Sequence, residues 1–296
     1  MTRVAFLGLG AIGAPMARHL ATDRFELAVW NRTPEKALAF ASTGRSRVAT
    51  TPADAARDAD VVITCLPSSR EVAALIDGPD GLLAGLGQGA LVVDCTSGDP
   101  GTSRRIAERL AAHGVDFVDA PVSGGTTGAE KGTLTVMCGG SDAAVGRARP
   151  VLEAFAERVV HCGGVGAGDA VKAVNNALLA VHIWSAAEGL AALAKAGVDA
   201  DLALEVINAS SGRSNASMNL FPERVLTRAF PRTFRLGLLD KDVAIAADLA
   251  RAARVPSPLL QLTAELFRAA HNALGDGADH VEAVKVVEQW AGVEIV

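Results

Sequence analysis

A lysine and two asparagines stand near the start of a long apolar stretch, VKAVNNALLAVHIWSAAEGL, at residues 171–190. At about 100° per residue, Lys172, Asn175 and Asn176 share one face of a helix, because they occupy positions i, i+3 and i+4. An unpaired ammonium is costly to bury. A lysine whose direction is fixed by neighbouring amides can serve as a general acid or base. A solvated first helical turn is the alternative explanation.

Two other groups of residues suit ligand binding. DAPVSGG, at residues 119–125, ends a predicted strand with the hydroxyl of Ser123 and with Gly124 and Gly125. Backbone N–H groups in such a loop can form a nest for a carboxylate. KDVAIAAD places Lys241 and Asp248 seven residues apart, and hence on one helix face. The alternatives are an ordinary glycine loop and a solvated charged face.

The first glycines of the chain have the spacing GxGxxG and lie between a predicted strand and a predicted helix. Gly8 allows a tight turn, Gly10 allows a pyrophosphate to approach the backbone, and Gly13 allows close packing of helix on strand. The strand–loop–helix context supports dinucleotide binding, whereas the spacing alone is weak. The predicted cofactor loop consists of Gly8, Leu9, Gly10, Ala11, Ile12 and Gly13.

The end of the second predicted strand bears on the choice of cofactor. An NAD-preferring site usually has an acidic residue there, which binds the adenosine ribose hydroxyls. This chain has Asn31, Arg32 and Thr33 instead. No carboxylate repels a 2′-phosphate, and a guanidinium can pair with one. The sequence therefore favours NADP over NAD, with a solvated Arg32 as the alternative.

Composition excludes several classes of protein. The 296 residues are 50% hydrophobic and carry a formal net charge of −5 with no basic run, which disfavours nucleic-acid and anionic-membrane partners. The four cysteines form no CxxC pair, so we expect neither a metal site nor disulfides. The absence of tyrosine excludes any mechanism that needs a catalytic Tyr. We expect no apolar stretch long and unbroken enough to span a bilayer, and we expect a cytoplasmic location.

The order of elements predicts two domains. Strand-like and helical patterns alternate over the first half, which predicts an α/β, doubly wound Rossmann sheet with helices on both faces. After Gly168 only helical patterns remain, beginning with a long helix from Asp169 to about residue 196. We therefore expect a nucleotide-binding domain at residues 1–165 and an all-α domain at 166–296, joined by a long interdomain helix.

Four motifs in order and at matching spacing give the sequence a resemblance to the β-hydroxyacid dehydrogenases, the family of 3-hydroxyisobutyrate dehydrogenase and tartronate semialdehyde reductase. They are FLGLGAIGAPMARHL, with Ile12 where methionine is usual; DAPVSGGTTGAEKGTLTVMCGG; the glycine pair Gly166 and Gly168 followed by Lys172, Asn175 and Asn176; and KDVAIAAD at 241–248. The resemblance covers essentially the whole chain. Within the family, INASSGRSNAS and the C-terminal segment look most like bacterial 3-hydroxyisobutyrate dehydrogenases.

The resemblance implies hydride transfer between NADP, or NAD, and the carbon that bears a substrate hydroxyl. Lys172 would accept the hydroxyl proton in oxidation and donate one in reduction, Asn176 would orient that amine and the reacting oxygen, and Asn175 would lie nearby. The other implied contacts are the substrate carboxylate on Ser123, Gly124 and Gly125; the nicotinamide and substrate near Lys241; the nicotinamide ribose near Thr96; the cofactor crevice along Leu66 and Pro67; and a lesser substrate contact at Asp248.

The family also implies a substrate class and an assembly. A small β-hydroxyacid is expected, most readily 3-hydroxyisobutyrate oxidised to methylmalonate semialdehyde. Reduction of another short semialdehyde, of the tartronate, succinic or glyoxylate type, and imine reductase-like chemistry remain as alternatives, although imine reductases generally lack the lysine. The resemblance places the catalytic cleft between the domains and implies a homodimer or homotetramer. Arg213 has three open roles: an anion contact in the pocket, a helix cap, or a subunit bridge.

Overall fold

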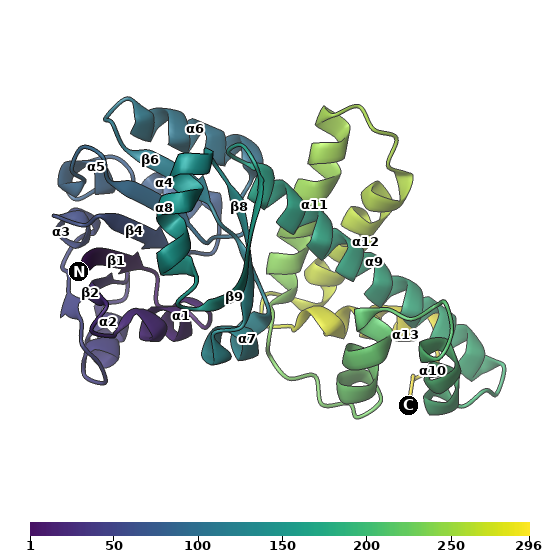
Figure 1. Ribbon diagram of the computed structural model, residues 1–296. Coiled ribbons are helices and arrows are strands. Elements are labelled where there is room, and N and C mark those ends of the chain that lie inside the picture. The colour runs from purple at the N-terminus through teal and green to yellow at the C-terminus, as the bar shows by residue number, and fades with distance from the viewer. The chain divides into compact units, whose positions relative to one another are not determined.

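The computed structural model describes residues 1–296, which form two compact units, Met1–Lys172 and Ala173–Val296. In Figure 1 the first unit runs from purple to teal and the second from green to yellow. The boundary falls after Lys172 rather than after residue 165. Helix α9 begins at Ala167, and its first residues pack within the first unit.

The first unit contains all the strands and a set of mostly short helices. The strands are β1 Thr2–Leu7, β2 Phe25–Trp30, β3 Arg47–Val48, β4 Val61–Thr64, β5 Leu91–Asp94, β6 Asp116–Asp119, β7 Val122–Ser123, β8 Leu134–Gly139 and β9 Ala156–Gly163. The helices are α1 Gly13–Leu20, α2 Pro34–Ala41, α3 Pro52–Ala56, α4 Ser69–Ala74, α5 Leu82–Gly85, α6 Pro100–Ala111, α7 Gly125–Lys131 and α8 Asp142–Leu152.

The second unit contains no strand. Helix α9, Ala167–Lys195, enters it from the first unit. It is followed by α10 Ala200–Asn208, the π-helical segment η1 Ala216–Val225, α11 Leu236–Ala252, α12 Pro258–Leu274, the short 3₁₀ segment η2 His280–Ala283 and α13 Val284–Ala291.

The sheet has the strand order β3-β2-β1-β4-β5-β6-β8-β7, with β9 paired to β8. The first six strands are mutually parallel and have the Rossmann order 3-2-1-4-5-6. Beyond β6 the sheet becomes mixed, because β8 is antiparallel to both β6 and β7. The predicted single run at 115–123 is thus two strands, β6 and β7.

Both faces of the sheet are covered, as a doubly wound fold requires. Successive residues of a strand point to opposite faces, and β1 follows this rule. Val4 and Phe6 pack in one core with α1, α2 and α8. Ala5 and Leu7 pack in the other core with α3, α4 and α6. The predicted α/β class with helices on both faces is confirmed.

The second unit packs around the rear part of α9. Ala177, Ala180, Ile183, Ala187 and Leu190 are all part of its core. That core is closed by α10, η1, α11, α12 and α13. Trp184 of α9 also meets Phe267 of α12, with 5.9 Å between the ring centroids. The part of α9 from Ala177 onward is therefore held in a packed helical core.

Helix α9 is also the one helix that is long and apolar enough, by length and composition, to cross a membrane, with a window of mean hydropathy 1.5. This differs from the expectation that no stretch would qualify. The core helix of a soluble protein meets the same criteria. Within the second unit one side of α9 packs in the core, and 39% of that window is buried.

Candidate active site

The three glycines of the first loop each have a distinct steric role. Gly8 has φ of +106°, and an added Cβ would lie 2.2 Å from the carbonyl oxygen of Cys65. A Cβ on Gly13 would lie 2.0 Å from the carbonyl oxygen of Gly8. A Cβ on Gly10 would meet nothing within 4 Å. Gly8 and Gly13 thus build the turn, and Gly10 leaves its backbone open, as a bound pyrophosphate requires.

The loop is fastened to the end of β2 by Asn31. Its Oδ1 accepts a hydrogen bond from the Leu9 N–H at 2.9 Å, and its Nδ2 donates to the Thr33 carbonyl at 3.0 Å. Arg32 is exposed and has no ion pair or hydrogen bond. Ile12 is partly buried against the adjoining core. An apolar side chain therefore suffices at position 12.

The remaining side chains of the loop are placed simply. Leu9 is buried in the core and Ala11 is exposed. Leu9 is therefore suited to cofactor contact only through its backbone, which agrees with a loop that binds phosphate through N–H groups.

The loops after β4 and β5 lie next to each other at the carboxyl edge of the sheet. The Leu66 N–H donates to Thr96 Oγ1 at 3.0 Å, and the Thr96 N–H donates to Asp94 Oδ1 at 3.0 Å. Pro67 is exposed, whereas Thr96 is buried. The structure therefore uses Thr96 to hold these two loops together. Open α/β sheets bind their ligands at this edge.

The predicted carboxylate nest has suitable backbone geometry. Ser123 ends β7, and Gly124 and Gly125 both have positive φ, +132° and +63°. Both glycines are exposed. The N–H groups that open α7 have no partner within the helix and remain available to an anion.

A polar chain connects the predicted catalytic residues of the second unit. Asn175 Nδ2 donates to Asn176 Oδ1 at 3.1 Å, and Asn176 Nδ2 donates to Asp242 Oδ2 at 2.6 Å. Lys241 Nζ donates to the other oxygen of Asp242 at 2.7 Å. Lys172 is buried one turn before Asn176 on α9. The structure thus brings Asn175, Asn176 and Lys241 together around a carboxylate.

Asp242 fixes the orientation of the Asn176 amide. A carboxylate only accepts hydrogen bonds, so the amide must present its NH₂ group to Asp242. The oxygen of Asn176 then points the other way, where it accepts a hydrogen bond from Asn175 and can accept another from an ammonium or a hydroxyl. Because Asn176 is 3% exposed and Asp242 is 2% exposed, water does not readily replace this bond. Sequence reasoning missed Asp242, which looked like one more charge beside Lys241.

Two of the predicted site residues do not take part in the hydrogen bonds around Asp242. Asp248 is exposed and forms an ion pair with Arg251, not with Lys241 or Asp242. Arg213 is exposed in the loop before η1. Neither residue is brought to the carboxylate of Asp242.

Three buried carboxylates of the first unit also escaped sequence reasoning. Asp94 ends β5, Asp119 ends β6, and Asp169 lies in the first turn of α9. Each is at most 1% exposed, and Asp94 is paired directly with Asp119 in the register of the two strands. The sequence shows only one sign of this cluster: Asp94 and Asp119 each stand at the end of an apolar run.

Burial dominates the electrostatics of this cluster. Desolvation, together with the neighbouring Asp119 and Asp94, raises the pKa of Asp169 to about 8, against hydrogen bonds from Ser103 and Gly98 that lower it. Desolvation also raises the pKa of Asp94 to about 6 and raises that of Asp119. We infer that Asp169 is protonated at neutral pH, because three like charges in one apolar site repel one another.

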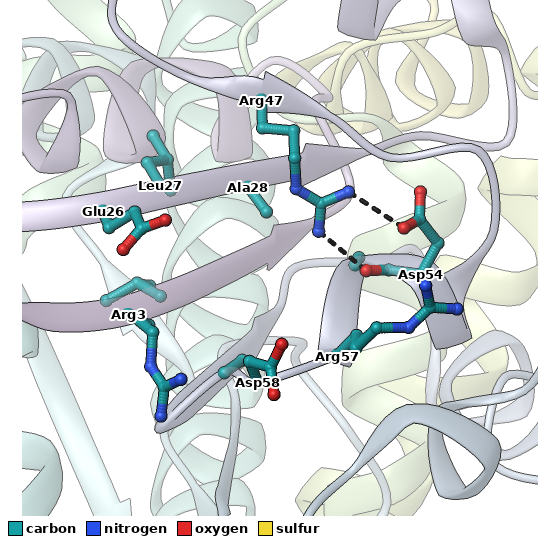
Figure 2. A pocket seen from close by; sticks show the side chains of 11 residues that line it. Arg3, Glu26, Leu27, Ala28, Arg47, Asp54, Arg57 and Asp58 are labelled. Atoms are coloured by element: carbon teal, nitrogen blue, oxygen red, sulfur yellow. Dashed lines mark hydrogen bonds and ion pairs between the residues drawn. The ribbon is translucent and has the colours of Figure 1, made fainter.

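A surface depression lies at the opposite edge of the sheet. Figure 2 shows it near the amino ends of β1 and β2, lined by Arg3, Glu26 and Arg57 and by the ion pair of Arg47 with Asp54. Dinucleotides bind at the carboxyl ends of parallel strands. This depression is therefore not the cofactor site.

The fold and these residues define a nicotinamide-nucleotide oxidoreductase. Residues 3–164 match the model of the NAD-binding domain of 6-phosphogluconate dehydrogenase. Residues 166–287 match the NAD-binding domain of NADP-dependent 3-hydroxyisobutyrate dehydrogenase. The chain belongs to the β-hydroxyacid dehydrogenase family, whose members act on CH–OH groups with NAD(P).

Similar proteins span nearly the full length of the chain. The 2-(hydroxymethyl)glutarate dehydrogenase of Eubacterium barkeri is 35% identical and covers 99% of this chain and 97% of its own. The 3-hydroxyisobutyrate dehydrogenase of Pseudomonas aeruginosa is 37% identical, with coverage of 90% and 91%. The structure of Mycobacterium tuberculosis 3-hydroxyisobutyrate dehydrogenase with L-serine has a TM-score of 0.89 at 32% identity, covering 97% and 99%.

More distant structures share the architecture. Psf3, in a complex with NADP⁺ and 2-OPP, has a TM-score of 0.84 at 29% identity and covers 96% of this chain and 99% of its own. The imine reductase of a Pseudomonas species has a TM-score of 0.58 at 20% identity, with coverage of 96% and 98%. At that identity the likeness shows a common fold only.

The raised pKa of Asp169 predicts a pH-dependent stability difference. Its pKa is about 8 in the fold, against an ordinary value of 3.8 for an aspartate, so between these values the native state binds one more proton than the unfolded state. The carboxyl group therefore costs stability increasingly as pH rises through this window. Asp169→Asn, which does not titrate, should gain on the parent by up to about 1 kcal/mol per pH unit from pH 5 to 7.5 in urea unfolding.

The matched control is Asp201→Asn, at an exposed aspartate of α10. Its stability should stay parallel to that of the parent over the same pH range. A parallel curve for Asp169→Asn would show that Asp169 is ionised in the fold.

Proposed function

We propose that this chain is an NADP-preferring dehydrogenase of a short β-hydroxyacid, most readily 3-hydroxyisobutyrate, with methylmalonate semialdehyde as the product. The observation that carries the proposal is the bond from Asn176 to Asp242, one turn after the buried Lys172. That bond turns an amide oxygen toward the space where a protonated lysine or a substrate hydroxyl needs an acceptor.

Lys172 is the proton-transfer group in this proposal. The bound nicotinamide would supply the hydride acceptor in oxidation and the hydride donor in reduction. Neutral Lys172 takes the hydroxyl proton during oxidation, and its ammonium returns one to the carbonyl oxygen during reduction. Asn176 holds the amine in line through its oxygen, and Asn175 supports that oxygen by its own hydrogen bond.

The substrate carboxylate suits the loop of Ser123, Gly124 and Gly125. Gly124 and Gly125 are exposed and have positive φ values in the turn that opens α7, and exposed N–H groups of such a turn can bind an anion. The Ser123 hydroxyl adds a donor. Lys241 supplies a cation near the substrate, and its pairing with Asp242 reduces its free charge. Asp248 is at most a peripheral contact, because it is exposed and paired with Arg251.

The preference for NADP rests on the end of β2. Asn31 is engaged with the glycine loop and carries no charge. Arg32 is exposed beside it and forms no ion pair that would compete for its guanidinium. An arginine in this position can bind a 2′-phosphate through two parallel hydrogen bonds. We further propose a cytoplasmic homo-oligomer, either dimer or tetramer, as expected of the family.

The substrate is tested by a panel of hydroxyacids with both cofactors. We expect the highest kcat/KM for 3-hydroxyisobutyrate with NADP⁺, ahead of L-serine, 2-(hydroxymethyl)glutarate, glycerate and 4-hydroxybutyrate. A decisive preference for one of the other acids would transfer the proposal to that substrate. Turnover of cyclic imines without turnover of any hydroxyacid would contradict it.

Replacement of the proposed proton-transfer group is the second test. Lys172→Ala should lower kcat by about 10²- to 10⁴-fold, because no other group then accepts the proton. Its Kd for NADP⁺, measured by fluorescence titration, should stay near that of the parent. The matched control is Lys195→Ala, at the exposed last residue of the same helix. Retained turnover in Lys172→Ala would refute the assignment.

The cofactor preference depends on one cation. Arg32→Ala should lower kcat/KM for NADP⁺ about tenfold or more, since a charged hydrogen-bond partner of the 2′-phosphate is lost. The value for NAD⁺ should change little. Arg57→Ala, at the opposite edge of the sheet (Figure 2), is the control. An equal loss with both cofactors would show that Arg32 does not read the 2′-phosphate.

A further inference from the structure

The N-terminus of α9 is capped by a side chain from a distant strand. Asp119 Oδ1 accepts the Gly166 N–H at 2.6 Å, and its Oδ2 accepts the Asp169 N–H at 3.0 Å. The Gly168 N–H also contributes. The first N–H groups of a helix have no partner within it, and here β6 supplies the acceptor. Both oxygens of Asp119 are therefore committed to the start of the helix that carries Lys172.

The buried carboxyl group of Asp169 ties the same helical turn to the loop after β5. Asp169 Oδ1 accepts the Gly98 N–H at 2.9 Å, and its Oδ2 accepts the Ser103 hydroxyl at 2.6 Å. Ser103 is buried in α6. The helix start is thus held from two directions, by β6 through Asp119 and by the 96–103 segment through Asp169.

Asp94 extends this connection to the loops after β4 and β5, which contain the proposed cofactor contacts Leu66 and Thr96. Asp94 accepts the Thr64 hydroxyl at 2.8 Å and the Thr96 N–H at 3.0 Å. Thr96 in turn accepts the Leu66 N–H. These hydrogen bonds, joined through the backbone of residues 96–98, therefore connect the ends of β4 and β5 to the first turn of α9.

Glycines leave the space that these carboxylates fill. A Cβ on Gly139 would lie 2.4 Å from Asp119 Oδ1. A Cβ on Gly168 would lie 2.9 Å from Asp119 Oδ2 and 2.1 Å from the Met137 carbonyl oxygen. A Cβ on Gly98 would lie 2.9 Å from Asp169 Oδ2. Such close approach on several sides leaves these carboxyl groups no alternative position.

We propose that Asp119 and Asp169 are positioning residues of the dehydrogenase reaction, which hold the first turn of α9 so that Lys172 meets the reacting oxygen. Neither carboxyl group touches substrate or cofactor in this role. They act on the backbone from which Lys172 extends one turn later. The inference rests on the proposed function, because it assumes that Lys172 transfers the proton.

The first test replaces Asp119 by its amide. In Asp119→Asn, one backbone N–H of the helix start faces an NH₂ group instead of an acceptor. The turn must shift, and we expect kcat to fall roughly 10- to 100-fold, as for a displacement of about 1 Å at a reacting group. The Kd for NADP⁺ should stay within about threefold of the parent, because the Gly8–Gly13 loop does not depend on this bond.

A double-mutant cycle separates positioning of Lys172 from general damage. If Asp119 acts through Lys172, then Asp119→Asn should cost less than about twofold in the Lys172→Ala background. An equal loss in both backgrounds would overturn the proposal. If Lys172→Ala itself retained full kcat, the proposed function would fail rather than this inference, so the two failures are distinguishable.

Asp169 provides the second variant, in case Asp119→Asn does not fold. Asp169→Ala leaves Gly98 N–H and Ser103 without their partner, and kcat should fall about tenfold. Asp169→Asn can accept from Gly98 with its oxygen and donate to the Ser103 hydroxyl with its NH₂ group, so kcat should return to near the parent value. Equal activity in the two variants would contradict the proposal.

Hydrogen exchange supplies a readout that needs no turnover. In the free protein, peptides that cover residues 164–172 should exchange faster in Asp169→Ala than in the parent, while peptides over residues 5–20 should be unchanged. Ser141→Ala removes the side-chain cap of α8 and is the control. It should lower the melting temperature without changing kcat. Unchanged exchange at 164–172 in Asp169→Ala would overturn the proposal.

Discussion

The burial of Asp119 against the first N–H groups of α9 is the interaction on which the rest of the site depends. Burying an ionised carboxyl group is costly, and the raised pKa values of Asp119 and Asp169 reflect that cost. Backbone N–H groups offset it, because they have no partner of their own at a helix start. The carboxyl group of β6 and the N–H groups of α9 are thus each other's hydrogen-bond partners. These hydrogen bonds fix the position at which α9 begins relative to β6.

The position of this first turn of α9 determines where Lys172 and Asn176 lie. Lys172 follows the capped turn, and Asn176 follows one turn later in the second unit. Behind them the buried side of α9, which includes Ala177, Ala180 and Ile183, packs in the core of the second unit, and this packing opposes sliding of the helix. Asp242 then selects the direction of the Asn176 amide. Asp119 in the first unit thus orients the backbone of the helix start, and Asp242 in the second unit orients the side chain of Asn176.

Much of this arrangement follows from the sequence, and the exceptions have physical reasons. The spacing of Gly8, Gly10 and Gly13 predicts the cofactor turn, since each position has its own steric requirement. The antiparallel β7 and β8 were not predicted, because a short apolar run does not encode strand direction. The π-helical η1 leaves no mark in a 3.6-residue periodicity. These misses concern direction and local winding rather than the class of fold.

The buried aspartates could not be predicted from their own surroundings in the sequence. A single aspartate at the end of an apolar run also fits a solvated strand end. The meeting of Asp94 with Asp119 depends on strand register, and that of Asp169 with Gly98 depends on tertiary packing. Asp242 resembles a surface charge until Asn176 is placed beside it. Constellations assembled from distant segments become visible only in the folded chain.

The most direct measurement of the central claim is a crystal structure of the ternary complex with NADP⁺ and 3-hydroxyisobutyrate. The account predicts that Lys172 Nζ lies about 2.6–3.2 Å from the substrate hydroxyl oxygen. It also predicts that the Asn176 oxygen faces that amine while its NH₂ group remains on Asp242. A substrate hydroxyl bound by another side chain, with Lys172 Nζ beyond hydrogen-bond reach, would contradict it.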